Sequence, residues 1–180
     1  MDFSSLSFIR LAKDHPLKDF DCGDADLTDF FHNDCKNYLS ALLAVTYVIQ
    51  NEDETIAFFS LLNDKITIKD VDGNSAWNKL RRKLHQRKRF TSYPAMKIGR
   101  LGVHNKHKGK QYGTAILDYL KVLFVTNNRT GCKYITVDAY KQSLRFYENN
   151  GFEYLTEKDK DSDTRLMYFD LANIYGKVNT

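Results

Sequence analysis

A basic stretch that contains a glycine, in the middle of the chain, is the first candidate for chemistry. Residues 104–112 read HNKHKGKQY, and an apolar, strand-like run at 98–103 precedes them. After them, apolar residues recur at helical spacing from Ile116 to Phe124. A strand, a glycine-bearing turn and a helix N-terminus together favour an anion, because backbone N–H groups and the positive end of the helix dipole point toward it. The stretch therefore predicts a phosphate-binding turn, to which three side chains add charge: Lys106, Lys108 and Lys110.

Several other classes of site or protein are not expected. The chain contains neither G-x-x-x-x-G-K-[ST] nor G-x-G-x-x-G, which argues against a P-loop and a Rossmann dinucleotide site. Cys22, Cys35 and Cys132 lack metal-like spacing, which favours free thiols in a reducing cytoplasm. The N-terminus lacks a signal-peptide pattern, and no apolar run reaches the ~20 residues of a membrane span. We therefore expect a cytoplasmic protein with no membrane association.

Positive charge is concentrated in one segment. The net charge is +4, and residues 79–89 (KLRRKLHQRKR) hold seven lysines or arginines and no acid, so that without them the net charge becomes −3. One interpretation is a surface that follows the phosphates of a nucleic acid. The other is the solvated face of an amphipathic helix whose Trp77, Leu80 and Leu84 point inward. The sequence leaves both open.

The pattern of elements predicts an α+β fold. At 180 residues the chain is most simply one domain, 1–180. Asp24 or Asp26 is expected to cap a helix with Leu27, Phe30 and Phe31 on its inner face. The full expected order is a strand at 7–11, this helix, a hairpin of strands at 42–50 and 55–62, a helix at 75–89, the strand, basic turn and helix described above, a strand at 133–137, a short helix at 143–150, and strands at 152–156 and 166–171. Such an order is typical of an α/β sandwich with a mixed sheet.

The basic turn and its flanks resemble the acyl-CoA signature of the GNAT superfamily of N-acetyltransferases. In that family a strand ending in L-x-V precedes [QR]-x-x-G-x-[GA] and a long helix, and here L-G-V precedes K-G-K-Q-Y-G at 108–113. Lys108 keeps a polar, charged group at the first position, whereas Gln111 replaces a glycine and limits the approach of a pyrophosphate. The element order also matches the GNAT fold, a mixed and mostly antiparallel central sheet flanked by helices. The resemblance implies acetyl-CoA as cosubstrate, bound by Leu101, Gly102, Val103, Lys108, Gly109, Lys110, Gln111, Tyr112, Gly113 and Thr114.

A second segment resembles the part of the family that supplies the proton donor. Residues 143–152 read SLRFYENNGF, similar to the family's A-x-x-[FL]-Y-E-x-x-G-F. The resemblance implies that Tyr147 protonates the departing CoA thiolate as an amine attacks the thioester. Tyrosine (pKa ~10) is protonated at neutral pH and is not grossly mismatched to a thiol of pKa ~8.5. The alternative is that Tyr147 is only a half-buried aromatic residue. Where the family often has an asparagine that holds CoA, this chain has Tyr140.

The remaining reactive residues have weaker cases. Asp138 follows a buried strand and is a candidate general base by position alone, since aspartates at strand ends more often form turns. His104 and His107 lie in the basic turn, and no third ligand indicates a metal site. Cys22 lacks a partnered base, which favours a buried thiol over a nucleophile.

The acceptor is an amine that the sequence does not identify. Residues 20–31 (FDCGDADLTDFF) resemble the start of a GNAT branch that includes toxins acetylating aminoacyl-tRNA. That likeness makes aminoacyl-tRNA a candidate acceptor, bound through Lys79–Arg89, and an antitoxin and a second copy of the chain candidate partners. The departures at Gln111 and Tyr140 keep a different class open, a non-catalytic acyl-CoA-sensing or RNA-binding module.

Overall fold

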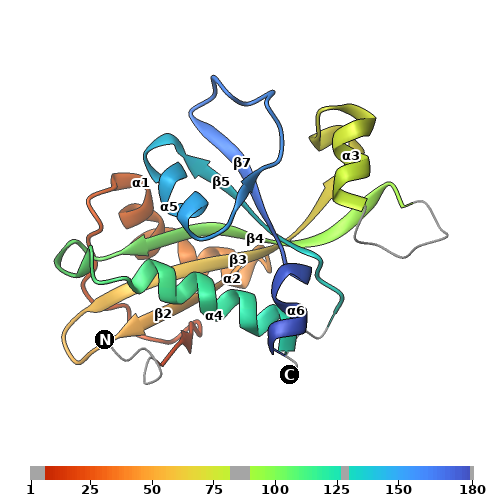
Figure 1. The fold of residues 1–180 in the computed structure, drawn as a ribbon. Coiled ribbons are helices and arrows are strands. Elements are labelled where there is room, and N and C mark those ends of the chain that lie inside the picture. Colours follow the sequence, from red (N-terminus) through yellow and green to blue (C-terminus); the bar gives the residue numbers. More distant parts are fainter. Residues whose placement is uncertain (1–6, 82–89, 127–129, 179–180) are drawn as a thin grey trace. The chain divides into compact units, whose positions relative to one another are not determined.

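The computed structural model describes residues 7–81, 90–126 and 130–178, and these contain the helices and strands of an α+β fold (Figure 1). The expected fold class is confirmed. The described residues contain a seven-stranded, mostly antiparallel sheet in the order β1-β2-β3-β4-β5-β7-β6. The strands are β1 (Ile9–Arg10), β2 (Val45–Gln50), β3 (Thr55–Thr67), β4 (Ser92–Val103), β5 (Tyr134–Tyr140), β6 (Glu153–Tyr154) and β7 (Thr164–Asp170). The α-helices are α1 (Ala25–Asp29), α2 (Cys35–Ser40), α3 (Gly73–Arg81), α4 (Tyr112–Thr126), α5 (Leu144–Asn149) and α6 (Ala172–Val178). One π-helix, Phe30–Asp34, and three 3₁₀ turns, Ile68–Asp70, Asn105–His107 and Lys141–Ser143, complete the described elements.

The chain divides into two compact units, and the first comprises residues 1–62 and 98–118. β2 and β3 pair antiparallel, with Val45 opposite Leu61. A cluster of aromatic side chains forms the core of this unit: Phe20, Phe30, Phe31 and Phe58. Asp24 caps α1 by accepting a hydrogen bond from the Leu27 amide at 3.1 Å, so the first of the two expected caps is confirmed.

The second unit comprises residues 63–97 and 119–180. β5 and β7 pair antiparallel along their whole length, with Val137 opposite Met167. Its core is built around a tryptophan and three tyrosines, Trp77, Tyr93, Tyr134 and Tyr168, together with aliphatic residues of β3 and α3. The buried hydroxyl of Tyr134 donates to the Leu80 carbonyl at 3.2 Å, which satisfies a polar group that burial would otherwise penalise.

Several elements differ from those expected. β3 continues to Thr67, where only 55–62 was expected, and β4 begins at Ser92, before Pro94. The helix expected at 75–89 begins at Gly73 and is described as far as Arg81; residues 82–89 lie outside the described part of the chain. Helix α6 was missed altogether. Asp170 starts it by accepting a hydrogen bond from the Ala172 amide at 2.9 Å, a weak local signal at the end of a strand.

Among the described residues, no helix combines the length and the apolar character needed to span a membrane.

Candidate functional site

Residues 104–111 connect β4 to α4 in the first unit, and we call them the phosphate turn. A 3₁₀ turn opens the segment, and it is capped by the imidazole of His104, whose Nδ1 accepts from the Lys106 amide at 3.2 Å. Further along, the Lys110 amide donates to the His107 carbonyl at 3.3 Å. The turn is therefore folded by its own hydrogen bonds before α4 begins.

The backbone of the phosphate turn twice enters the left-handed region. Gly109 has φ +76° and Gln111 has φ +63°. The first bond of α4 runs from the Ala115 amide to the Gln111 carbonyl at 3.0 Å, so the amides of Gly113 and Thr114 have no acceptor inside the helix. Left-handed turns that lead into a helix N-terminus form concave sites that bind anions. The turn thus has a backbone shape that suits an anion, and its binding of the CoA phosphates stays a prediction.

The three lysines of the turn are held in different ways. Lys106 Nζ lies 2.7 Å from Glu54 Oε2 and forms an ion pair with it. Lys108 Nζ donates to the Cys22 carbonyl at 2.6 Å. Lys110 Nζ lies 3.5 Å from His107 Nδ1. The three lysines that we expected to bind an anion therefore also make contacts that stabilise the turn.

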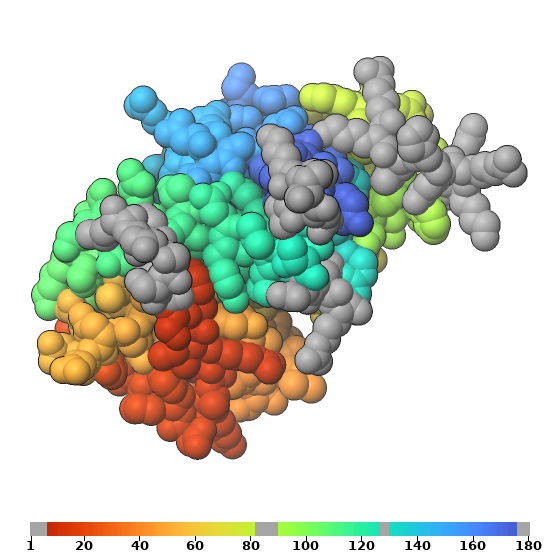
Figure 2. Space-filling view, turned by 60° about the horizontal axis from the view of Figure 1, so that its bottom comes forward, coloured from red at the N-terminus to blue at the C-terminus, as the bar shows by residue number. Residues whose placement is uncertain are grey.

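Glu54 links the phosphate turn to the hairpin between β2 and β3. Asn51 shapes that hairpin, because its side-chain oxygen accepts from the amides of Asp53 and Glu54 at 2.9 and 2.8 Å. Figure 2 shows the hairpin and the phosphate turn side by side on the surface of the first unit. Hydrogen bonds from Lys106 and then from His107 lower the pKa of Glu54 to about 2. The carboxylate is therefore ionised throughout the physiological range.

His104 lies beside two carboxylates that sequence analysis did not connect with it. Its Nε2 is 3.7 Å from Glu54 Oε2 and 4.0 Å from Asp19 Oδ2, and one potential ligand atom from each of the three residues lies within 4.8 Å of the others. A metal would need a deprotonated Nε2, but Nδ1 already accepts the Lys106 amide, so the ring carries its proton on Nε2. The Lys106 ammonium also occupies Glu54 Oε2. The Lys106–Glu54 ion pair therefore argues against a metal site, although the buried Nε2 of His104 has no hydrogen-bond partner among the described residues.

The strand end Leu101-Gly102-Val103 leads directly into the phosphate turn. A Cβ atom on Gly102 would lie 2.8 Å from Phe58 Cε1 and 3.0 Å from Phe20 Cζ, so close packing requires glycine there. The His104 amide donates to the Ile56 carbonyl at 2.9 Å, which continues the strand pairing into the turn. Pairing of this strand with the pantetheine arm of CoA stays a prediction.

Tyr147 lies on α5 in the second unit. It is 6% exposed, and its ring packs against Phe146 and Phe152 with centroid separations of 5.0 and 5.3 Å. Gly151, with φ +80°, ends the helix and turns the chain so that the Phe152 amide donates to the Tyr147 carbonyl at 3.0 Å. Burial raises the pKa of the Tyr147 hydroxyl above its ordinary value. The side chain is therefore a neutral O–H donor at physiological pH.

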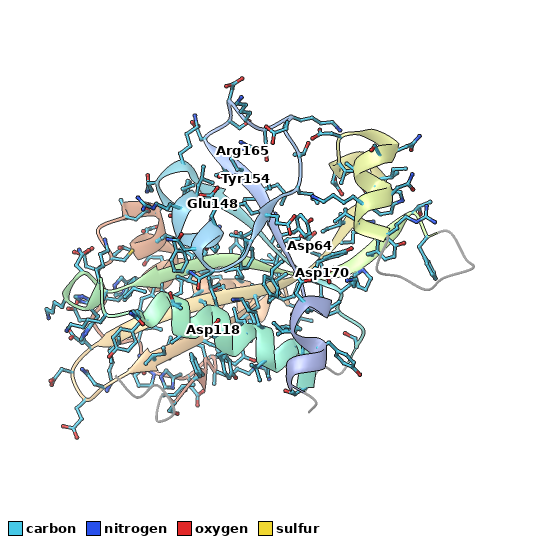
Figure 3. The ribbon with its side chains drawn as sticks, in the orientation of Figure 1. Asp64, Asp118, Glu148, Tyr154, Arg165 and Asp170 are labelled. Atoms are coloured by element: carbon cyan, nitrogen blue, oxygen red, sulfur yellow. The ribbon has the colours of Figure 1, made fainter. Side chains whose placement is uncertain are left out.

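The glutamate of the same motif has a structural partner. Figure 3 labels Glu148, Tyr154 and Arg165, which lie close together in the second unit. Burial, followed by a hydrogen bond to Glu148, raises the pKa of Tyr154. The guanidinium carbon of Arg165 is 4.5 Å from the centre of the Tyr154 ring. This stack connects α5 with β6 and β7, and it could be found only in the structure because its members come from three elements.

The other candidates have ordinary environments. Asp138 is half exposed and forms an ion pair with Lys97. The Cys22 thiol is buried and lies 3.7 Å from both the Asp24 carbonyl and the Thr28 hydroxyl. Tyr140 is partly exposed at the end of β5. In the helix that was expected at 75–89, Trp77 and Leu80 are buried as expected and Lys79 is exposed, while Leu84 lies outside the described residues.

Comparisons with known proteins point to one family. The family model described as an acetyltransferase (GNAT) domain matches residues 43–154. A sequence search of curated proteins found no match. Among solved structures, AtaT complexed with acetyl-methionyl-tRNAfMet is 18% identical with a TM-score of 0.75, over 98% of this chain and 100% of that one. A tyrosine-to-phenylalanine mutant of KacT is 17% identical with a TM-score of 0.75, over 96% and 98%. A KacTA–DNA complex is 16% identical with a TM-score of 0.70, over 97% and 99%.

Proposed function

The chain belongs to the GNAT acetyltransferase family, and from that premise we propose that it transfers an acetyl group from acetyl-CoA directly to a primary amine, with Tyr147 as the general acid. The family's enzymes are acyl-CoA-dependent N-acetyltransferases, and acetyl-CoA is the cosubstrate. The proposal concerns the acceptor, the acid and the residues that hold the cosubstrate.

The observation that carries the proposal is the backbone of the phosphate turn. Two left-handed residues, Gly109 and Gln111, lead into a 15-residue helix, with the amides of Gly113 and Thr114 at its N-terminus. Such a turn suits the diphosphate of CoA. The residues assigned to this role are Lys108, Gly109, Lys110, Gln111, Tyr112, Gly113 and Thr114, and the backbone of Leu101, Gly102 and Val103 is assigned to the pantetheine arm.

The reaction balances without a covalent enzyme intermediate. The neutral amine attacks the thioester carbonyl, a C–N bond forms, and the C–S bond then breaks. The Tyr147 hydroxyl gives its proton to the departing thiolate, and the proton released by the amine then restores the tyrosine hydroxyl. Burial raises the pKa of Tyr147, which keeps its hydroxyl protonated until the reaction but also makes it a weaker acid than a thiol. Its proton transfer must therefore be coupled to breakage of the C–S bond.

Replacement of Tyr147 by phenylalanine tests this role. We expect kcat to fall by roughly 10²–10⁴-fold, the usual contribution of a positioned acid. The dissociation constant for acetyl-CoA should stay within about twofold, because phenylalanine keeps the packing between Phe146 and Phe152. Phe146→Leu on the same helix is the matched control for packing. Unchanged turnover in Tyr147→Phe would remove this residue from the mechanism.

A second, more specific acceptor is the α-amine of an aminoacyl-tRNA. It is favoured by the shared fold with AtaT, whose structure is of a complex with acetyl-methionyl-tRNAfMet, and by the basic segment Lys79–Arg89. Under this proposal the protein acts in the cytoplasm and an antitoxin is its partner, as the AtaT structure bound to the antitoxin AtaR suggests.

Charge reversal in the basic segment separates the two acceptors. A variant with Arg81, Arg82, Arg87 and Lys88 replaced by glutamate should lose acetylation of aminoacyl-tRNA and keep acetyl-CoA binding, because tRNA binding depends on contacts with phosphates. The variant's activity should also lose the steep salt dependence expected of the wild type. Full tRNA acetylation by the variant would contradict the tRNA proposal and leave a small-molecule or protein amine as the acceptor.

A further inference from the structure

Both carboxylate oxygens of Glu54 accept hydrogen bonds from the phosphate turn. Its Oε2 accepts from Lys106 Nζ at 2.7 Å and its Oε1 accepts from His107 Nε2 at 2.8 Å. The carboxylate is 12% exposed, although it belongs to the β2–β3 hairpin on the protein surface. Charge-assisted bonds of this length from two side chains fix both the position and the rotation of the carboxylate.

The contacts extend beyond the two direct partners. A carboxylate can only accept, so His107 carries its proton on Nε2, and its Nδ1 is the acceptor that faces Lys110 Nζ at 3.5 Å. The protonated Nε2 of His104 also faces Glu54, at 3.7 Å, while the Nδ1 of the same ring accepts the Lys106 amide. Glu54 therefore contacts Lys106 and His107 directly, and it contacts Lys110 indirectly, through His107.

We infer that Glu54 is a positioning residue for the cosubstrate: it holds the phosphate turn in the conformation that receives the diphosphate of acetyl-CoA. The inference rests on the proposed function, in which this turn binds the diphosphate. Because Glu54 orients Lys106, His107 and Lys110, the turn reaches the bound conformation before the ligand arrives and less ordering entropy is lost on binding. Glu54 itself touches none of the reacting atoms.

A positioning role and a purely electrostatic role predict opposite changes in CoA affinity when Glu54 is replaced by glutamine. A negative charge near an anion site repels the anion, so simple electrostatics predicts that Glu54→Gln binds CoA more tightly. Loss of a positioning group predicts weaker binding, because glutamine replaces one of the two accepting oxygens by an NH2 group, which cannot accept from Lys106 or His107. Glu52 lies in the same hairpin and is exposed, so Glu52→Gln removes the same charge without touching the turn. Comparison of CoA binding by Glu54→Gln and Glu52→Gln therefore separates loss of the positioning contacts from loss of one negative charge.

The test measures CoA binding by calorimetry and kinetics with two acetyl donors. In Glu54→Gln we expect CoA affinity to fall and the KM for acetyl-CoA to rise, each by about tenfold, with kcat little changed. With S-acetylpantetheine, which lacks the diphosphate, kcat/KM should equal that of the wild type. Glu52→Gln should bind CoA as tightly as the wild type or slightly more so. A purely structural role would instead lower activity with both donors.

A second variant keeps the test decisive if Glu54→Gln does not fold. Glu54→Asp preserves the charge but is one methylene shorter and cannot reach both partners, so it should also weaken CoA binding and spare S-acetylpantetheine. Equal or tighter CoA binding by the folded Glu54 variants overturns the positioning role alone. A wild-type chain that fails to bind CoA overturns the proposed function itself, so the two failures are distinguishable.

Discussion

Gln111 stands where the GNAT signature has glycine, and its backbone has the conformation that glycine prefers. Its φ of +63° places a residue with a Cβ atom in the left-handed region. Holding such a residue there costs ~1–2 kcal/mol relative to glycine. Glycine gains more conformational freedom in the unfolded chain, which cancels ~0.4–1 kcal/mol of that difference. We therefore predict that Gln111→Gly raises the free energy of unfolding by about 0.5–1 kcal/mol and the melting temperature by about 2 °C.

The same substitution should also strengthen acetyl-CoA binding. Removal of the side chain lets the backbone of the phosphate turn approach a diphosphate more closely. We expect a few-fold lower dissociation constant for CoA, measured by calorimetry, alongside thermal unfolding followed by circular dichroism. Gln111→Ala is the matched control, because alanine keeps the Cβ atom and hence the backbone strain.

A second residue with positive φ, Leu42, provides a control that tests the effect on stability without an effect on CoA binding. Leu42 has φ +58° at the end of α2 and is 91% exposed, so Leu42→Gly should give a similar gain in stability with no change in CoA affinity. If Gln111→Gly is no more stable than the wild type, or if Gln111→Ala gains as much, the strain argument is wrong.

Three further predictions follow from packing and charge. Gly102→Ala should lower the free energy of unfolding by about 1–3 kcal/mol, because its new Cβ atom would lie 2.8 Å from the buried Phe58 ring. Gly131→Ala, whose Cβ atom would have no neighbour within 4 Å among the described residues, should be near neutral, and chemical denaturation measures both. The pKa of Glu54, lowered from its ordinary 4.5 to about 2, means that its stabilisation is present above pH 4.5 and is lost as the pH falls toward 2; the stability difference from Glu54→Gln should shrink over that window. Arg165→Met removes the partner of the mostly buried Asp159 carboxylate, which lies 2.6 Å from Arg165 Nε, and should lower the free energy of unfolding by about 3 kcal/mol. Lys79→Met breaks an exposed ion pair with Glu153 and should lower it by under about 1 kcal/mol.

Local patterns predicted the parts of the fold that depend on local physics. The cap at Asp24, the buried Phe30 and Phe31, the strand at 133–137 and the short helix with Tyr147 all carry signals within a few residues, and the structure confirms each one. The α+β class followed from the order of these elements. The single-domain organisation and the assigned site residues stay predictions.

The parts that sequence analysis missed depend on contacts between distant residues. Asp19, Glu54 and His104 are far apart in sequence, and no spacing rule links them, so the network behind the phosphate turn emerged only from the structure. The left-handed conformation of Gln111 was hidden for a different reason, since glutamine gives no signal for a positive φ. The extension of β3 to Thr67 reflects pairing in the sheet, which outweighs local propensity.

Transfer of label from acetyl-CoA tests the central claim most directly. Purified protein is incubated with acetyl-labelled acetyl-CoA and a bacterial lysate, and label is counted in the small-molecule, protein and RNA fractions, with Tyr147→Phe in parallel. The proposed function predicts label in at least one fraction with the wild type and a large loss with the variant; label in RNA that disappears on mild deacylation of tRNA would identify aminoacyl-tRNA as the acceptor. Bound acetyl-CoA with no label in any fraction would contradict the proposed transfer to an amine.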